Sequence, residues 1–105
     1  MKIFFNSTFI SKESLKDTYI NYPIKLEYYK IINEDEIIKG KKPKYGISIE
    51  KTEYTEKNIN VEKKTIKYLS NDEKKIEKIL NLFKENEVTP ISAVDIICDL
   101  KKNYN

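Results

Sequence analysis

Apolar and polar residues alternate through the first two thirds of the chain, a pattern typical of β-strands with one covered face. The alternation is clearest over residues 45–54, where the sequence YGISIE places tyrosine and isoleucine at every second position. Residues 24–32 and 59–69 show similar alternation, and residues 2–10 form a further candidate strand within an N-terminal strand or tail, 1–23. The pattern therefore predicts an antiparallel β-meander of three to four strands, with its main part at 24–69.

The parity of the apolar residues changes within the last of these strands. Ile59 and Val61 have one parity, whereas Ile66 and Tyr68 have the other. If apolar residues face a single core, one extra residue must lie between the two pairs. We therefore expect a β-bulge near Lys63–Lys64.

After the meander, the period changes from two residues to 3.6, which indicates helices over 70–102. The segment from Ser70 to Glu73 matches a capping box with Ser70 as N-cap, and this helix should end near Asn86. Its apolar residues recur at i, i+3, i+4 and i+7, a narrow stripe typical of a helix lying on a core. They are Ile76, Ile79, Leu80 and Phe83.

A second helix is expected from Pro90 to about Lys102, with Thr89 as N-cap and proline at the first helical position. Apolar residues occupy well over half of its circumference, so it is buried on more than one side or pairs with another chain. Its candidate protein-interface residues are Ile91, Val94, Ile96, Ile97 and Leu100, together with Cys98, which we expect to be a buried, unreactive thiol.

Together these elements predict one α+β domain over residues 1–105, with both C-terminal helices packed on one face of the sheet. The favoured function is a non-enzymatic protein-interaction or regulatory module that binds another protein or a second copy of itself. Replacing Ile96 by aspartate should abolish association without unfolding if Ile96 lies at the interface, and should unfold the chain if it lies in the core.

Composition removes many forms of catalysis. Of the residues, 35% are charged, the formal net charge is +3, and the chain has no histidine, no tryptophan and no arginine. Without histidine there is no imidazole base or histidine metal ligand, and Cys98, the single cysteine, cannot form an internal disulfide. Together with the absence of a cofactor fingerprint, this predicts a protein that is not an enzyme and holds no cofactor or metal.

Two groups of carboxylates are candidates for binding a cation or for acid/base chemistry. Glu34-Asp35-Glu36 lacks the spacing and glycine of a calcium loop, so a polar turn is the better interpretation. Asp95 and Asp99 are four residues apart, as an acid/base pair could be, but they also match the wet side of an apolar helix.

Nucleic-acid binding is the alternative function. A lysine-rich loop around Gly40 could contact phosphates while tyrosines of the sheet stack on bases. The candidate contact residues are Lys39, Lys41, Lys42, Lys44, Tyr29 and Tyr54. The absence of arginine argues against this alternative.

The N-terminus shows neither a signal peptide nor a membrane-spanning segment, and a single cysteine fits a reducing compartment, so a cytoplasmic location is expected. Lysine, isoleucine and asparagine are abundant, which is typical of AT-rich bacterial or phage genes.

Two short motifs carry a resemblance to a known family. Tyr45-Gly46-Ile47-Ser48-Ile49 lies within the meander, and Val88-Thr89-Pro90 opens the last helix, which contains Asp95 and Asp99. Over residues 24–102, this arrangement resembles a family of short proteins of unknown function from clostridia and related Gram-positive bacteria. The resemblance implies a cytoplasmic bacterial protein and transfers no catalytic residue.

Overall fold

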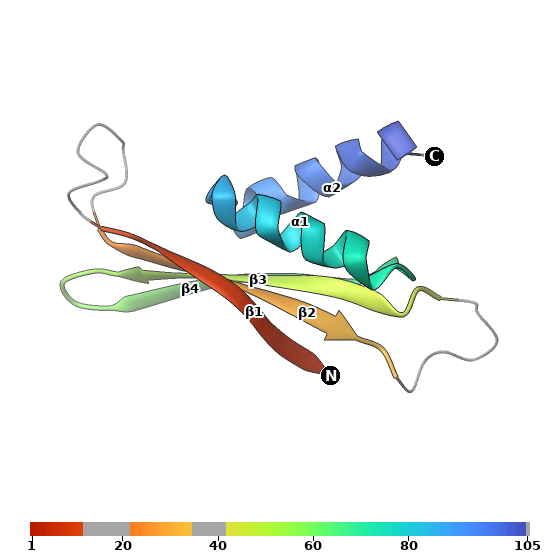
Figure 1. The fold of residues 1–105 in the computed structure, drawn as a ribbon. Coiled ribbons are helices and arrows are strands. Elements are labelled where there is room, and N and C mark those ends of the chain that lie inside the picture. Colours follow the sequence, from red (N-terminus) through yellow and green to blue (C-terminus); the bar gives the residue numbers. More distant parts are fainter. Residues whose placement is uncertain (12–21, 35–41, 105) are drawn as a thin grey trace.

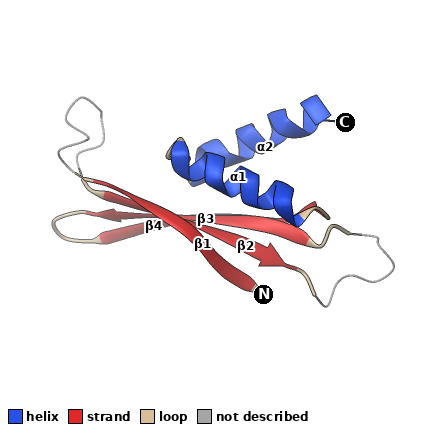
Figure 2. Cartoon of the chain, viewed as in Figure 1, coloured by secondary structure: helices blue, strands red, loops and turns tan. Residues whose placement is uncertain are grey.

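The computed structural model describes residues 1–11, 22–34 and 42–104 and confirms the predicted α+β fold. Four strands precede two helices, and both helices lie on the same face of the sheet (Figure 1, Figure 2). In chain order, the elements are β1 (Lys2–Ile10), β2 (Ile24–Ile32), β3 (Tyr45–Tyr54), β4 (Ile59–Ser70), α1 (Glu73–Glu85) and α2 (Pro90–Tyr104).

The sheet is an antiparallel meander with the strand order β1-β2-β3-β4. The N-terminal candidate strand is thus part of the sheet, and β1 and β4 form its two edges. Of the strands, β3 and β4 give α2 its main contacts, whereas α1 contacts all four. Consequently α2 lies toward the β4 side of the sheet.

Each strand has one face under the helices and one uncovered face. In β2, Leu26 and Tyr28 are fully buried beneath the helices, and their neighbour on β3, Ile49, is buried with them. The apolar stripe of α1 closes this core from above, as its spacing predicted. The buried cluster consists of Ile24, Leu26, Tyr28, Ile47, Ile49, Ile76, Ile79, Leu80, Phe83, Val88, Ala93 and Ile97.

The N-cap of α1 is Asp72, so the expectation that Ser70 caps this helix is wrong. The carboxylate of Asp72 accepts hydrogen bonds from the backbone N–H groups of Lys74 and Lys75, at 3.0 and 3.4 Å. Ser70 is still in β4, and its hydroxyl instead accepts from the N–H of Asp72 at 3.0 Å. Because β4 extends through Ser70, the helix starts two residues later than a capping box would require.

The β-bulge expected near Lys63–Lys64 is also misplaced. These two residues pair regularly with Glu50 and Ile49, and the register shifts instead between Tyr45 and Ile47. The prediction assumed that every apolar residue of β4 faces the core. Ile59 and Val61 do not, since they lie on the uncovered face and are 64% and 60% exposed.

The observed irregularity explains why residue 46 is glycine. At this point β4 passes so close to β3 that a Cβ on Gly46 would clash with the backbone carbonyl groups of Ile66 and Lys67. A residue without a side chain permits this approach of two backbones.

One buried hydrogen bond joins the sheet to the turn between the helices. The hydroxyl of Tyr28 donates to the carbonyl oxygen of Val88 at 2.8 Å. Burial raises the pKa of Tyr28 above its ordinary value. The bond fixes the start of α2 over Tyr28, at the level along the strands of the cross-strand row Tyr28, Ile49 and Lys64.

The start of α2 agrees with the sequence prediction. The helix begins at Pro90, and the hydroxyl of Thr89 accepts a hydrogen bond from the N–H of Ser92 at 3.3 Å.

Candidate interaction surface

The apolar arc of α2 is divided among three environments. Ile97 is 3% exposed and belongs to the core together with Ala93, so it is unavailable to a partner of the folded chain. Ile96 and Leu100 are half-buried and pack against the core. Ile91, by contrast, is 73% exposed.

Cys98 is exposed, so the expectation that it is buried is wrong. The reason is its position on the helix. Ala93 and Ile97 face the sheet, and one further residue turns the side chain by about 100°. Cys98 therefore lies on the flank of α2 that it shares with Ile91 and Val94.

The opposite flank of α2 lines an apolar groove beside α1. Ile96 and Leu100 face this groove from α2, and Ile79 and Leu82 line it from α1. A neighbouring hollow that shares Ile79, Leu82 and Leu100 with this groove is bordered by lysines of α1, among them Lys78. Since Ile96 and Leu100 face α1, the flank carrying Ile91, Val94 and Cys98 points away from α1, toward the β4 side of the sheet.

β4 itself has no neighbouring strand on its outer side among the residues that the structure describes. The direction of its backbone groups follows from the turn, where the N–H of Thr55 donates to the carbonyl of Asn58 at 2.9 Å. Bonded and non-bonded pairs alternate in an antiparallel ladder, so the next pair, Tyr54 and Ile59, is not bonded within the hairpin. The N–H of Tyr54 accordingly donates to Pro23 on the other side.

By the same alternation, the backbone N–H and C=O groups that point out from the sheet belong to every second residue of β4. They are those of Ile59, Val61, Lys63 and Thr65. We call this segment, with the side chains of Ile91, Val94 and Cys98 on α2, the β4–α2 edge. It combines backbone hydrogen-bonding groups that have no neighbouring strand among the described residues with the exposed side chains of Ile91 and Cys98 and the half-buried side chain of Val94.

The sequence patterns did not identify this edge. The signal was present in the parity change of β4, which we interpreted as a bulge although it marks apolar residues on an uncovered face. Apolar residues in such a position are characteristic of interaction sites.

The uncovered face of the sheet carries further aromatic residues. The rings of Phe4 and Tyr29 meet edge to face with centroids 5.7 Å apart, and the Lys2 ammonium lies 4.2 Å from the Tyr29 centroid. The Tyr29 hydroxyl donates to the carboxylate of Glu27 at 3.1 Å. Burial, followed by the bond to Glu27, raises the pKa of Tyr29 to about 12.

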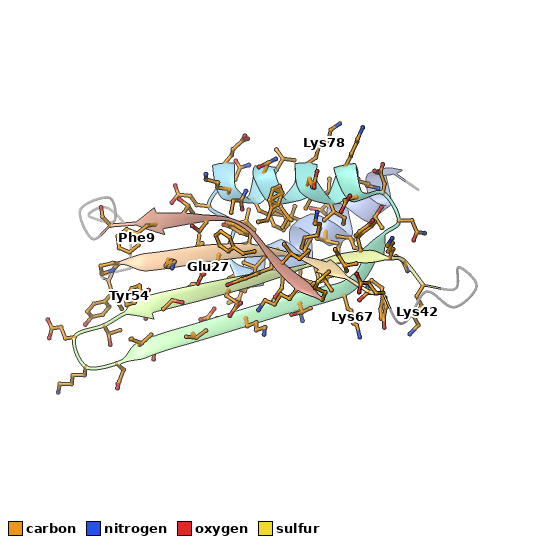
Figure 3. All side chains as sticks on the ribbon, turned by 60° about the horizontal axis from the view of Figure 1, so that its bottom comes forward. Phe9, Glu27, Lys42, Tyr54, Lys67 and Lys78 are labelled. Carbon is orange, nitrogen blue, oxygen red and sulfur yellow. The ribbon has the colours of Figure 1, made fainter. Side chains whose placement is uncertain are left out.

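Those residues proposed for nucleic-acid contact that the structure describes do not form one cluster. Lys39 and Lys41 lie outside the described residues. The Lys44 ammonium lies 5.5 Å from the ring of Tyr45, at the start of β3, whereas Tyr54 lies at the opposite end of that strand. Figure 3 shows the same separation between Lys42 and Tyr54. The ammonium group of Lys42 is 4.6 Å from the ring of Tyr68.

The described residues include neither a cluster of metal ligands nor a helix that could span a membrane. Within residues 1–11, 22–34 and 42–104, no group of three or more potential metal ligands is found. In the same part of the chain, no helix has the length and apolar character needed to cross a membrane. Asp95 and Asp99 are exposed, and Glu34 is exposed while Asp35 and Glu36 lie outside the described residues.

Comparison with known proteins identifies a family but no characterised relative. No curated protein matches the chain, and no solved structure does. A family model described as "Family of unknown function (DUF6514)" matches residues 6–103, which is nearly the whole chain. The expectation of an uncharacterised family is thereby confirmed, and the chain belongs to the DUF6514 family of unknown function.

Proposed function

We propose that this protein is a non-enzymatic protein-interaction module that binds its partner through the β4–α2 edge. The observation that carries this proposal is the 73% exposure of Ile91 on α2, a helix that contacts β4, together with the outer edge of β4, which has no neighbouring strand among the described residues. Unprotected strand edges pair readily with other chains, and an apolar flank beside the edge adds a hydrophobic contact.

The energetics favour an occupied edge. Complete burial of one isoleucine side chain contributes about 1.5–3 kcal/mol relative to full exposure. Ile91, Ile59 and Val61 each retain more than half of their exposure in the isolated chain. A partner strand would cover part of this apolar surface and satisfy the outward N–H and C=O groups of β4.

The experiment is affinity capture from a lysate of the host, treated with nuclease, using the tagged chain and its Ile91→Asp variant. The matched control is Leu82→Asp, because Leu82 is a second exposed apolar residue, 49% exposed, but lies on α1 away from the edge. We expect a protein that is retained by the wild type and by Leu82→Asp and is lost with Ile91→Asp. Equal retention by all three proteins would contradict the proposal.

Circular dichroism of the variants is the necessary control for folding. Because Ile91 is mostly exposed, Ile91→Asp should unfold at the same denaturant concentration as the wild type, within the uncertainty of the measurement. Ile96, the residue first considered for this test, packs against the core and is therefore less suitable.

Nucleic-acid binding is the alternative proposal, supported by the position of Tyr29 and Tyr54 on the uncovered face and by the net charge of +3. Two carboxylates weaken it, since Glu27 accepts from the Tyr29 hydroxyl and Glu50 pairs with Lys2 on the same face. This alternative requires an affinity that falls steeply with salt concentration. Charge reversal of Lys42 should then also weaken binding.

For the cellular setting, we propose a cytoplasmic protein of a Gram-positive bacterium. The support is the single cysteine and the lysine- and isoleucine-rich composition. Fluorescence microscopy of the tagged protein in its host would test the location.

A further inference from the structure

The occupant of the β4–α2 edge can be inferred from the register that this edge permits. A second strand must offer its own outward backbone groups to those of Ile59, Val61, Lys63 and Thr65. If the second strand is another copy of β4 in antiparallel orientation, odd-numbered residues must face odd-numbered residues. This restricts the self-pairing to a few registers, each centred on one residue.

One of these registers is complementary in charge. With Lys63 opposite Lys63 of the second copy, Glu62 of each chain lies opposite Lys64 of the other, giving two symmetric ion pairs. The registers centred on Glu62, Lys63 and Lys64 all place like charges opposite one another at the centre, but those centred on Glu62 and on Lys64 lose both ion pairs. The Lys63 side chains that meet in the favoured register each have Glu50 beside them on β3.

The arrangement of α2 fits the same register. The Tyr28–Val88 hydrogen bond places the start of α2, measured along the strands, at the level of the row that ends in Lys64, one residue from the centre of the pairing. A twofold axis perpendicular to the sheet keeps both helix layers on one side, so the two α2 helices would be neighbours.

Adjacent strands are about 4.8 Å apart, so the twofold axis lies about 2.4 Å beyond β4. Because α2 contacts both β3 and β4, each α2 helix lies on the side of its sheet that is closer to this axis. The flanks of the two helices that carry Ile91 and Val94 would then face each other.

We propose that the β4–α2 edge binds a second copy of this chain, with β4 pairing antiparallel about Lys63 to form a continuous eight-stranded sheet. This inference rests on the proposed function and specifies its partner. The surface is self-complementary in backbone hydrogen bonding, in charge and in apolar side chains, as a twofold interface requires.

Charge reversal followed by mixing tests the register. Glu62→Lys and Lys64→Glu each place like charges opposite one another in a homodimer, and we expect each to raise the dimer dissociation constant at least about 10-fold. A mixture of the two variants restores both ion pairs in the heterodimer. Analytical ultracentrifugation should therefore show monomers for each variant alone and dimers for the mixture.

The matched controls reverse charges on α1, away from the edge. Lys78→Glu and Glu85→Lys change the net charge by the same amounts and should leave the dimer unchanged. Circular dichroism establishes folding of Glu62→Lys, since Glu62 also pairs with Lys51 at 3.7 Å within the chain.

The possible failures are distinguishable. A wild-type chain that stays monomeric at all accessible concentrations overturns self-association but leaves the proposed function intact, because Ile91→Asp still tests binding to a different protein. A wild-type dimer that is insensitive to both reversals, or variants whose mixture does not dimerise, would overturn the β4 pairing about Lys63.

Discussion

Removing the hydroxyl of Tyr28 should destabilise the fold without disturbing its packing. The side chain is fully buried, and its hydroxyl donates to the Val88 carbonyl at 2.8 Å. In the Tyr28→Phe variant the ring still packs near Phe83, whose centroid is 6.3 Å away. The lost free energy of unfolding therefore reports mainly the hydrogen bond.

The expected magnitude follows from the environment of the two atoms. A typical hydrogen bond contributes about 1 kcal/mol to stability, and leaving a buried carbonyl without its donor costs about 1–3 kcal/mol. Val88 is only 5% exposed, so water reaches its carbonyl poorly. We expect Tyr28→Phe to lower the free energy of unfolding by about 1–2 kcal/mol and the Tm by about 5–10 °C.

Urea denaturation followed by circular dichroism at pH 7 measures this difference. Tyr54→Phe is the matched control, because Tyr54 is 38% exposed and the same atom is removed. Its free energy of unfolding should stay within about 0.5 kcal/mol of the wild type. If Tyr28→Phe behaves like Tyr54→Phe, the bond to Val88 does not stabilise the start of α2, and the placement of that helix loses its main support.

Two further predictions concern the sheet. Gly46→Ala places a Cβ against the backbone carbonyl of Lys67. This variant should therefore lower the free energy of unfolding, measured in urea, by about 1–3 kcal/mol or more. A stability equal to that of the wild type would disprove the close approach of the two backbones. The pKa of Tyr29 is raised to about 12 in the folded chain, compared with about 10 when unfolded. The stability that protonated Tyr29 contributes to the folded chain is therefore fully present below pH 10 and is lost as the pH rises toward 12. In Tyr29→Phe, tyrosinate absorbance should show one fewer tyrosine that titrates near pH 12. The free energy of unfolding of this variant should fall less steeply between pH 10 and pH 12 than that of the wild type. An unchanged titration would contradict the raised pKa of Tyr29.

The sequence predicted those elements in which apolar residues and buried residues coincide. In α1, four apolar residues form one stripe, and all four are buried. In β2 and β3, the alternating apolar residues beneath the helices are buried in the same way. One covered face produces one apolar face, so periodicity alone is sufficient there.

The prediction was wrong where apolar residues lie on uncovered surface. Ile59 and Val61 belong to the uncovered face, and periodicity could not distinguish them from core residues displaced by a bulge. For α2, the apolar arc was too wide to indicate which side meets the sheet. That choice depends on the position of α1, so Ile97 became core and Cys98 became exposed.

Both departures concern residues on the β4 side of the molecule, and one arrangement accounts for them. In the proposed pairing, Val61 lies opposite Thr65 of the second copy, and Ile59 lies opposite the aliphatic stem of Lys67. The α2 flanks that carry Ile91 and Val94 face each other across the same axis. An isolated chain has no evident reason to keep apolar residues at these positions, because their exposure lowers solubility and invites aggregation. If a second copy covers these residues, the expectation that apolar residues are buried holds for the dimer, although it fails for the single chain.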